Sequence, residues 1–213
     1  MTQGGLPQPP VLLITDRRMA ARPLTDVVAA ALDGGCRWIL VREKDLPADA
    51  LANVASEIAA LARPYEATLS VSGAAAIAER AGAGGVHLPQ AETGRAAIAD
   101  ARSRLGAGAL IGVSTHSLDE AESAADDGAD YVTFSPIFLT ASKPGYGPAL
   151  GLEGLANAAA QLPIPVLALA GIDVSNARDC RAAGAAGIAI MGSIMRAPDP
   201  GAAMAATIAA WES

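Results

Sequence analysis

Aromatic residues and cysteines are scarce in this chain of 213 residues, and each shortage excludes a class of protein. Phe, Trp and Tyr together make up 3% of the residues, so the hydrophobic fraction of 52% consists mainly of alanine, leucine, isoleucine and valine. Alanine favours helices and β-branched residues favour strands, so this composition indicates a packed globular protein and excludes a disordered chain. The two cysteines, Cys36 and Cys180, are too few for a disulfide scaffold, and we interpret them as small buried residues.

Positive charge is also in short supply, and long hydrophobic runs are missing. The net charge is −7, which argues against a nucleic-acid partner because neutralising phosphates requires a basic face. The apolar runs are short and interrupted by charged residues or glycine, so we expect no membrane span. The first ten residues have neither the basic nor the apolar segment of a targeting signal. We therefore expect a cytoplasmic protein, and the sequence leaves open whether it forms a homo-oligomer.

Eight short apolar runs alternate with alanine-rich segments of helical character. The runs predicted as strands are Val11–Thr15, Arg37–Val41, Thr68–Val71, Gly85–Leu88, Ala109–Val113, Asp130–Phe134, Pro165–Ala170 and Ala186–Met191. Apolar strands that are each followed by a helix are typical of a parallel sheet covered by helices. Eight such units predict an α/β fold, a single (β/α)8 TIM barrel over residues 11–213, after a flexible tail at residues 1–10. A doubly wound open sheet is the main alternative, but TDRR at residues 15–18 lacks the glycine-rich nucleotide-binding pattern.

The active site of a (β/α)8 barrel lies at the carboxyl ends of its strands. The chain has only two lysines and two histidines, and all four fall at this predicted end: Lys44, His87, His116 and Lys143. Histidine changes its charge near neutral pH, so His87 and His116 are candidates for proton transfer. Two alternatives stay open, because His87 can be a hydrogen-bonded core residue and His116 can help to cap the following helix.

Two anion sites are predicted at the same end of the barrel. The sequences AGID at residues 170–173 and MGSI at residues 191–194 close the last two strands, where barrel loops commonly bind phosphate through backbone N–H groups. The phosphate-binding residues predicted there are Gly171, Gly192 and Ser193. The residues predicted to form a second anion pocket are Arg42, Lys44, Ser114 and Lys143. Surface pairing of Arg42 with Glu43 or Asp45 is the alternative to a functional role.

Motifs spread over residues 11–195 make the chain resemble thiamine phosphate synthase and its TenI relatives. They are VREKD at 41–45, GVHLPQAE at 85–92, IGVSTHSLDEA at 111–121, GADYVTFSPIFLTASK at 128–143, GLEGL at 151–155, IPVLALAGI at 164–172 and GIAIMGSI at 187–194. The resemblance implies a (β/α)8 barrel and an enzyme of thiamine biosynthesis. The family's synthases join an aminopyrimidine diphosphate to a thiazole phosphate with the help of Mg²⁺ and release pyrophosphate. Some TenI proteins instead convert a thiazole carboxylate phosphate tautomer to its aromatic form by proton transfer.

The resemblance also implies roles for individual residues. Arg42, Lys44, Ser114 and Lys143 match the family's pyrimidine and diphosphate contacts, Thr140 and Ser142 match the threonines of its P-T-x-T-K loop, and Gly171, Gly192 and Ser193 match its thiazole-phosphate site. Glu92 matches one of the two aspartates that bind Mg²⁺ in the synthases. The catalytic candidates are His87, His116 and Lys143.

Several contacts of the synthases are replaced in this chain. Leu40 stands where they have a pyrimidine-binding glutamine, and Ser72 and Gly73 stand where they have an asparagine and a metal-binding aspartate. Mg²⁺ needs oxygen ligands in strict geometry, so this pattern favours a TenI-like protein that binds thiazole phosphate without a metal cofactor. At the position where the TenI branch has its histidine, this chain has Pro136.

Three functions therefore follow from the sequence. The favoured one is thiazole tautomer proton transfer in the TenI manner, with His87 or His116 moving the proton. The first alternative is a thiamine phosphate synthase that also binds the aminopyrimidine diphosphate and uses Mg²⁺ at Glu92. The second is a non-catalytic thiazole-phosphate-binding or regulatory protein.

Overall fold

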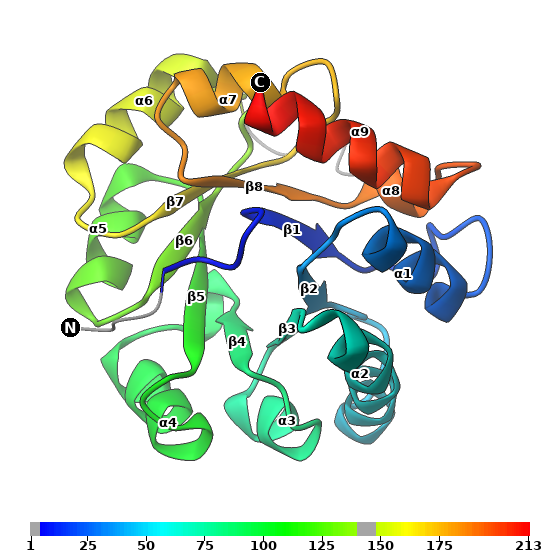
Figure 1. Cartoon of the computed structure of the whole chain (residues 1–213). Coiled ribbons are helices and arrows are strands. Elements are labelled where there is room, and N and C mark those ends of the chain that lie inside the picture. Colours follow the sequence, from blue (N-terminus) through cyan, green and yellow to red (C-terminus); the bar gives the residue numbers. More distant parts are fainter. Residues whose placement is uncertain (1–4, 140–147) are drawn as a thin grey trace.

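Eight parallel strands close into a barrel in the computed structural model of this chain, which describes residues 5–139 and 148–213 (Figure 1). They are β1 (Val11–Ile14), β2 (Trp38–Val41), β3 (Thr68–Ser72), β4 (Gly85–Leu88), β5 (Leu110–Thr115), β6 (Tyr131–Phe134), β7 (Val166–Leu169) and β8 (Gly187–Ile190). Each strand pairs with the next one in the chain, and β1 closes the barrel by pairing with β8. The predicted (β/α)8 barrel is therefore confirmed.

Helices cover the outside of the ring of strands (Figure 1). They are α1 (Leu24–Asp33), α2 (Ala48–Ala62), α3 (Ala75–Arg80), α4 (Arg95–Leu105), α5 (Leu118–Asp126), α6 (Gly151–Gln161), α7 (Ala177–Ala182) and α9 (Pro200–Glu212). Three short helical segments are not predicted by the sequence pattern: the 3-10 turns η1 (Arg63–Tyr65) and η2 (Gln90–Glu92), and α8 (Gly192–Met195), which follows β8 directly. Among the helices of the described ranges, none is both long and apolar enough to cross a membrane.

The strands are buried on both faces, which explains their near-continuous apolar sequences. Side chains along a strand point alternately to its two faces. Leu12, Trp38 and Tyr131 fill the interior of the barrel, whereas Leu13 and Ile39 pack in the layer between the strands and the helices. Aliphatic side chains make up most of the outer layer, and Trp38 and Tyr131 are the aromatic residues of the interior cluster.

The amino-terminal end of the barrel is covered by the segment that precedes β1, residues 5–10. Leu6 packs against the interior cluster, and the Pro10 carbonyl accepts a hydrogen bond of 3.0 Å from the N–H of Ile188. A hollow of about 680 Å³ beside this segment is lined mostly by glycine and alanine. The polar strand ends gather at the opposite end of the barrel, where the candidate site lies.

Candidate active site at the carboxyl ends of the strands

A cavity of about 720 Å³ opens at the carboxyl ends of the strands, and all eight strands or the loops that follow them contribute to its walls. The predicted site residues that line it are Arg42, Lys44, His87, Ser114, His116, Gly171, Gly192 and Ser193. The parallel strands bring these residues together because all their carboxyl ends meet at one rim. The predicted residues Thr140, Ser142 and Lys143 lie outside the described residues.

Arg42 and Lys44 form a cationic part of this wall, which we call the β2 rim. Residues in an extended segment alternate in direction, so Arg42 and Lys44 line the cavity while Glu43 between them is buried. Glu43 accepts a hydrogen bond of 2.7 Å from Thr15 Oγ1 and one of 2.9 Å from the N–H of Arg17, which ties the loop after β1 to β2. The positive charge of Arg42 lowers the pKa of Lys44, as expected of two neighbouring cations.

Glu43 and Asp45, which the sequence offered as surface partners for Arg42, form ion pairs with Arg17. Its guanidinium donates two hydrogen bonds of 2.7 Å to Asp45 and lies 3.3 Å from Glu43 Oε2. Arg17 follows β1 and its partners follow β2, so the pairing depends on the neighbouring positions of these strands in the barrel. The sequence shows only that charged residues follow both strands, and it does not show which of them pair.

His87 lies on β4 at the floor of the cavity and is 3% exposed. Its Nε2 atom is 3.0 Å from Ser114 Oγ, and its Nδ1 atom is 3.1 Å from the Tyr131 hydroxyl. Burial, together with the charge of Arg42, lowers the pKa of His87 to about 3. The imidazole is therefore neutral at physiological pH, so it hydrogen-bonds to substrate or protein far better than it carries a proton.

Tyr131 reaches His87 by crossing the interior of the barrel from β6. Its ring packs edge-on against Trp38, with the ring centroids 4.9 Å apart. Gly112 on β5 makes room for this ring, because a Cβ atom there would lie 2.1 Å from the nearest ring carbon. The Trp38 Nε1–H group donates to Ser70 Oγ at 3.3 Å. These groups form a buried polar layer beneath the cavity that holds His87 in place.

His116 lies just beyond β5 on the wall of the cavity. Its Nδ1 atom is 3.0 Å from the Ser135 carbonyl oxygen and 3.1 Å from Ser135 Oγ, so the ring bridges the ends of β5 and β6. Ser117 Oγ accepts a hydrogen bond from the N–H of Glu120 and caps α5, while Glu120 accepts one from the N–H of His116. The side-chain cap of α5 therefore comes from Ser117, and the His116 ring stays beside the cavity.

The loops after β7 and β8 form a second part of the wall, which we call the β7–β8 rim and define by Gly171, Gly192 and Ser193. Gly171 has a φ of +68°, and a Cβ atom there would lie 2.7 Å from the Cβ of Phe138, so only glycine fits without strain. Ser193 Oγ donates to the Ile172 carbonyl at 3.4 Å and joins the two loops. The space that a Cβ atom would need at Gly192 is occupied by the Arg196 guanidinium, so main chain and a cation lie together in this part of the wall.

The donor set that the synthases use for Mg²⁺ is not reproduced by the described residues. Ser72 lines the cavity, but Gly73 has no side chain, and Glu92 lies exposed on η2 and is not part of the cavity wall. Within residues 5–139 and 148–213, no three His, Cys, Asp or Glu side chains come together in a way that could hold a metal ion. These residues therefore do not fit a protein-held Mg²⁺ ion, and we derive no chemical step through a metal.

One charged residue of the cavity wall was missed by reasoning from the sequence. Arg196 lines the cavity next to the β7–β8 rim. It follows α8, a helix of four residues that the hydrophobic pattern does not predict. The only signal in the sequence is an arginine a few residues after the last strand, and such a position does not by itself indicate where the side chain points.

Comparison with known proteins supports the resemblance drawn from the motifs. The family model described as thiamine monophosphate synthase matches residues 11–194. A relative from Geobacter sulfurreducens is 46% identical over 88% of this chain and 87% of its own, and the thiamine-phosphate synthase of a Roseiflexus species is 39% identical over 91% and 81%. The solved structure of thiamine phosphate pyrophosphorylase from Pyrococcus furiosus superposes with a TM-score of 0.83, at 31% identity over 95% of each chain. The names of the Roseiflexus and Pyrococcus furiosus enzymes correspond to the synthase alternative and not to the favoured TenI branch.

Proposed function

Because the chain belongs to the thiamine monophosphate synthase family, we propose that it joins an aminopyrimidine diphosphate to a thiazole phosphate and releases pyrophosphate. The observation that carries this proposal is the presence of two sets of anion-binding groups in one cavity, the β2 rim and the β7–β8 rim. Two such sets suit a reaction between two phosphorylated substrates, with the diphosphate at the β2 rim and the thiazole phosphate at the β7–β8 rim.

The β2 rim offers positive charge to the leaving group of this reaction. The bond between the pyrimidine methylene carbon and the diphosphate oxygen breaks, and its electron pair leaves with the pyrophosphate. The thiazole ring nitrogen supplies the electron pair of the new carbon–nitrogen bond. Negative charge grows on the leaving diphosphate, where the Arg42 guanidinium offers a paired contact to phosphate oxygens and Lys44 offers a second positive charge.

The environment of His87 suits this chemistry better than proton transfer. A pKa of about 3 keeps the ring neutral, so it adds no positive charge beside a carbon that becomes electron-poor. The hydrogen bond of 3.0 Å between Nε2 and Ser114 Oγ holds the serine at the cavity floor, where it can contact the pyrimidine. Ser114 thus acts as a polar contact that orients the substrate, and His87 acts as a positioning residue for Ser114.

A TenI-like tautomerase is the second candidate, and the replaced contacts on the pyrimidine side favour it. Leu40 and Ser72 line the cavity where the family's synthases have glutamine and asparagine, so one polar contact to the pyrimidine is lost and the other is replaced by a shorter side chain. In this reaction His116 is the proton carrier, because His87 is neutral throughout the physiological range.

The experiment offers both reactions to the same purified protein. One assay supplies the aminopyrimidine diphosphate and the thiazole phosphate, with and without Mg²⁺, and measures thiamine phosphate. The other supplies the thiazole carboxylate phosphate tautomer and measures its aromatic form. We expect thiamine phosphate formation, with kcat/KM lowered about 10-fold to 100-fold in Arg42→Gln and unchanged in Arg178→Gln, a surface substitution on α7. Aromatisation that disappears in His116→Gln, without thiamine phosphate formation, would instead favour the tautomerase. Binding of thiazole phosphate without either reaction would leave a binding protein.

A further inference from the structure

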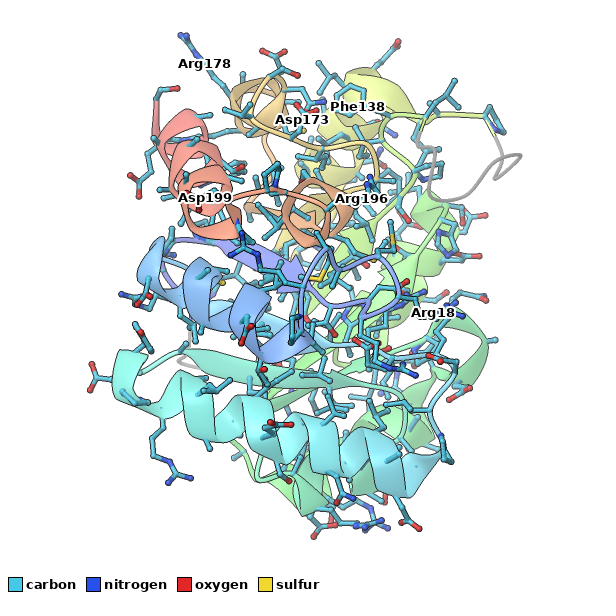
Figure 2. All side chains as sticks on the ribbon, turned by 90° about the vertical axis from the view of Figure 1, so that its right-hand side faces the viewer. Arg18, Phe138, Asp173, Arg178, Arg196 and Asp199 are labelled. Carbon is cyan, nitrogen blue, oxygen red and sulfur yellow. The ribbon has the colours of Figure 1, made fainter. Side chains whose placement is uncertain are left out.

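Arg196 lies over the backbone of the β7–β8 rim. Its guanidinium is so close to Gly192 that a Cβ atom added there would meet Nη2 at 2.5 Å and Nη1 at 2.8 Å. The same side chain lines the cavity together with Ser193. Figure 2 shows Arg196 toward the side of the molecule where Arg18 of the cavity wall also lies, whereas Arg178 projects from the outer edge.

Two carboxylates in this part of the fold, Asp173 and Asp199, have hydrogen-bond partners other than Arg196. Asp173, which also lines the cavity, accepts from the N–H of Ser175 at 2.8 Å and from its hydroxyl at 2.6 Å. Asp199 accepts from the N–H of Ala202 at 3.0 Å and caps α9. Across the described part of the chain, Arg196 forms no ion pair, which leaves a cation at the rim available to a bound anion.

We propose that Arg196 binds the phosphate of the thiazole substrate and makes this end of the cavity selective for the phosphate ester over the free alcohol. The inference rests on the proposed function, because it takes the β7–β8 rim as the thiazole-phosphate end. The two Nη atoms above Gly192 present donors in the planar arrangement that matches two phosphate oxygens. Ser193 lines the cavity beside the guanidinium, so its polar groups can contact the same phosphate. The alcohol form of the thiazole has no charge for Arg196 to pair with.

Calorimetric titration with the two thiazoles tests this role directly. Thiazole phosphate and the unphosphorylated hydroxyethyl thiazole are each titrated into wild type, Arg196→Gln and Arg196→Lys, with Arg178→Gln as the matched control. We expect Arg196→Gln to weaken binding of thiazole phosphate about 10-fold or more, because a hydrogen-bonded charge pair is lost. Arg196→Lys retains part of the affinity, Arg178→Gln behaves as wild type, and all four proteins bind the alcohol equally. The difference between wild type and Arg196→Gln decreases in about 0.5 M salt, because an exposed ion pair is screened.

Two results would overturn the inference: equal affinity of wild type and Arg196→Gln for thiazole phosphate, or an equal loss for the phosphate and the alcohol. Thiamine phosphate formation by the same preparations separates this outcome from failure of the proposed function. Arg196-dependent binding without thiamine phosphate formation contradicts the proposed function alone. Thiamine phosphate formation with an unchanged KM for thiazole phosphate in Arg196→Gln contradicts the role of Arg196 alone. A wild-type protein without affinity for thiazole phosphate contradicts both.

Discussion

Removal of the Tyr131 hydroxyl tests whether the buried polar layer supports the site. Tyr131→Phe keeps the ring and its edge-on contact with Trp38, but it takes the hydroxyl away from His87 Nδ1, which is 3.1 Å distant. His87 is 3% exposed, so water has little access to replace the lost partner. A buried polar group left without its hydrogen bond costs about 1–3 kcal/mol. We expect the free energy of unfolding to fall by that amount.

Urea unfolding followed by the fluorescence of Trp38 and Trp211 measures this loss. The matched control is Tyr65→Phe, because the Tyr65 hydroxyl bonds to Asp33 at the surface, where water can take its place. The control should change the free energy of unfolding by no more than about 0.5 kcal/mol. A Tyr131→Phe protein that unfolds at the same midpoint as wild type, or that loses no more than the control, would refute the buried network as a source of stability.

Three other substitutions or conditions give separate expectations. Gly112→Ala places a Cβ atom 2.1 Å from the Tyr131 ring, so we expect the free energy of unfolding in urea to fall by about 1–3 kcal/mol. A midpoint close to that of wild type would show that the ring can move aside. The pKa of His87 falls from 6.5 in the unfolded chain to about 3 in the folded one, so the unfolded chain binds the extra proton between these values. The free energy of unfolding should therefore fall as the pH is lowered from about 6.5 toward 3, by up to about 1.4 kcal/mol per pH unit. In His87→Asn the free energy of unfolding should depend less steeply on pH in this range. Equal slopes in the two proteins would contradict the buried neutral ring. Asp130→Asn removes the charge that accepts hydrogen bonds of 2.8 and 2.9 Å from Arg102. We expect the free energy of unfolding to fall by about 1–3 kcal/mol in thermal or urea unfolding. An unchanged free energy of unfolding would mean that this pair makes no net contribution.

The barrel could be predicted from the sequence because its physical signals are local and repeated. Each strand is a short apolar run, and each alanine-rich segment that follows can form a helix over it. The placement of Arg42, His87 and Gly171 at one rim then needed no further information, because parallel strands in a closed barrel share one carboxyl end. Short segments such as α8 were missed because four residues carry too little periodicity to register.

Side-chain pairing and protonation state could not be read from the sequence. The motif VREKD shows that cations and carboxylates follow β2, but only the folded barrel brings Arg17 to Glu43 and Asp45. His87 was a candidate proton carrier because free imidazole titrates near neutral pH, and burial beside Tyr131 changes that property. Arg196 depends on a turn after β8 that directs its side chain back over Gly192. The first two features arise from contacts between distant segments, and the third arises from a short local turn that the hydrophobic pattern does not reveal.

Simultaneous binding of two anions is the central claim, and one titration tests it most directly. Pyrophosphate is titrated into the protein alone and into the protein already saturated with thiazole phosphate, and the heat of binding gives the affinity in each case. If the β2 rim and the β7–β8 rim are separate sites, pyrophosphate binds one per chain with an affinity that saturating thiazole phosphate does not weaken. Loss of pyrophosphate binding in proportion to the thiazole phosphate present would show that the two anions compete for one place, and would contradict a cavity that holds two phosphorylated substrates together.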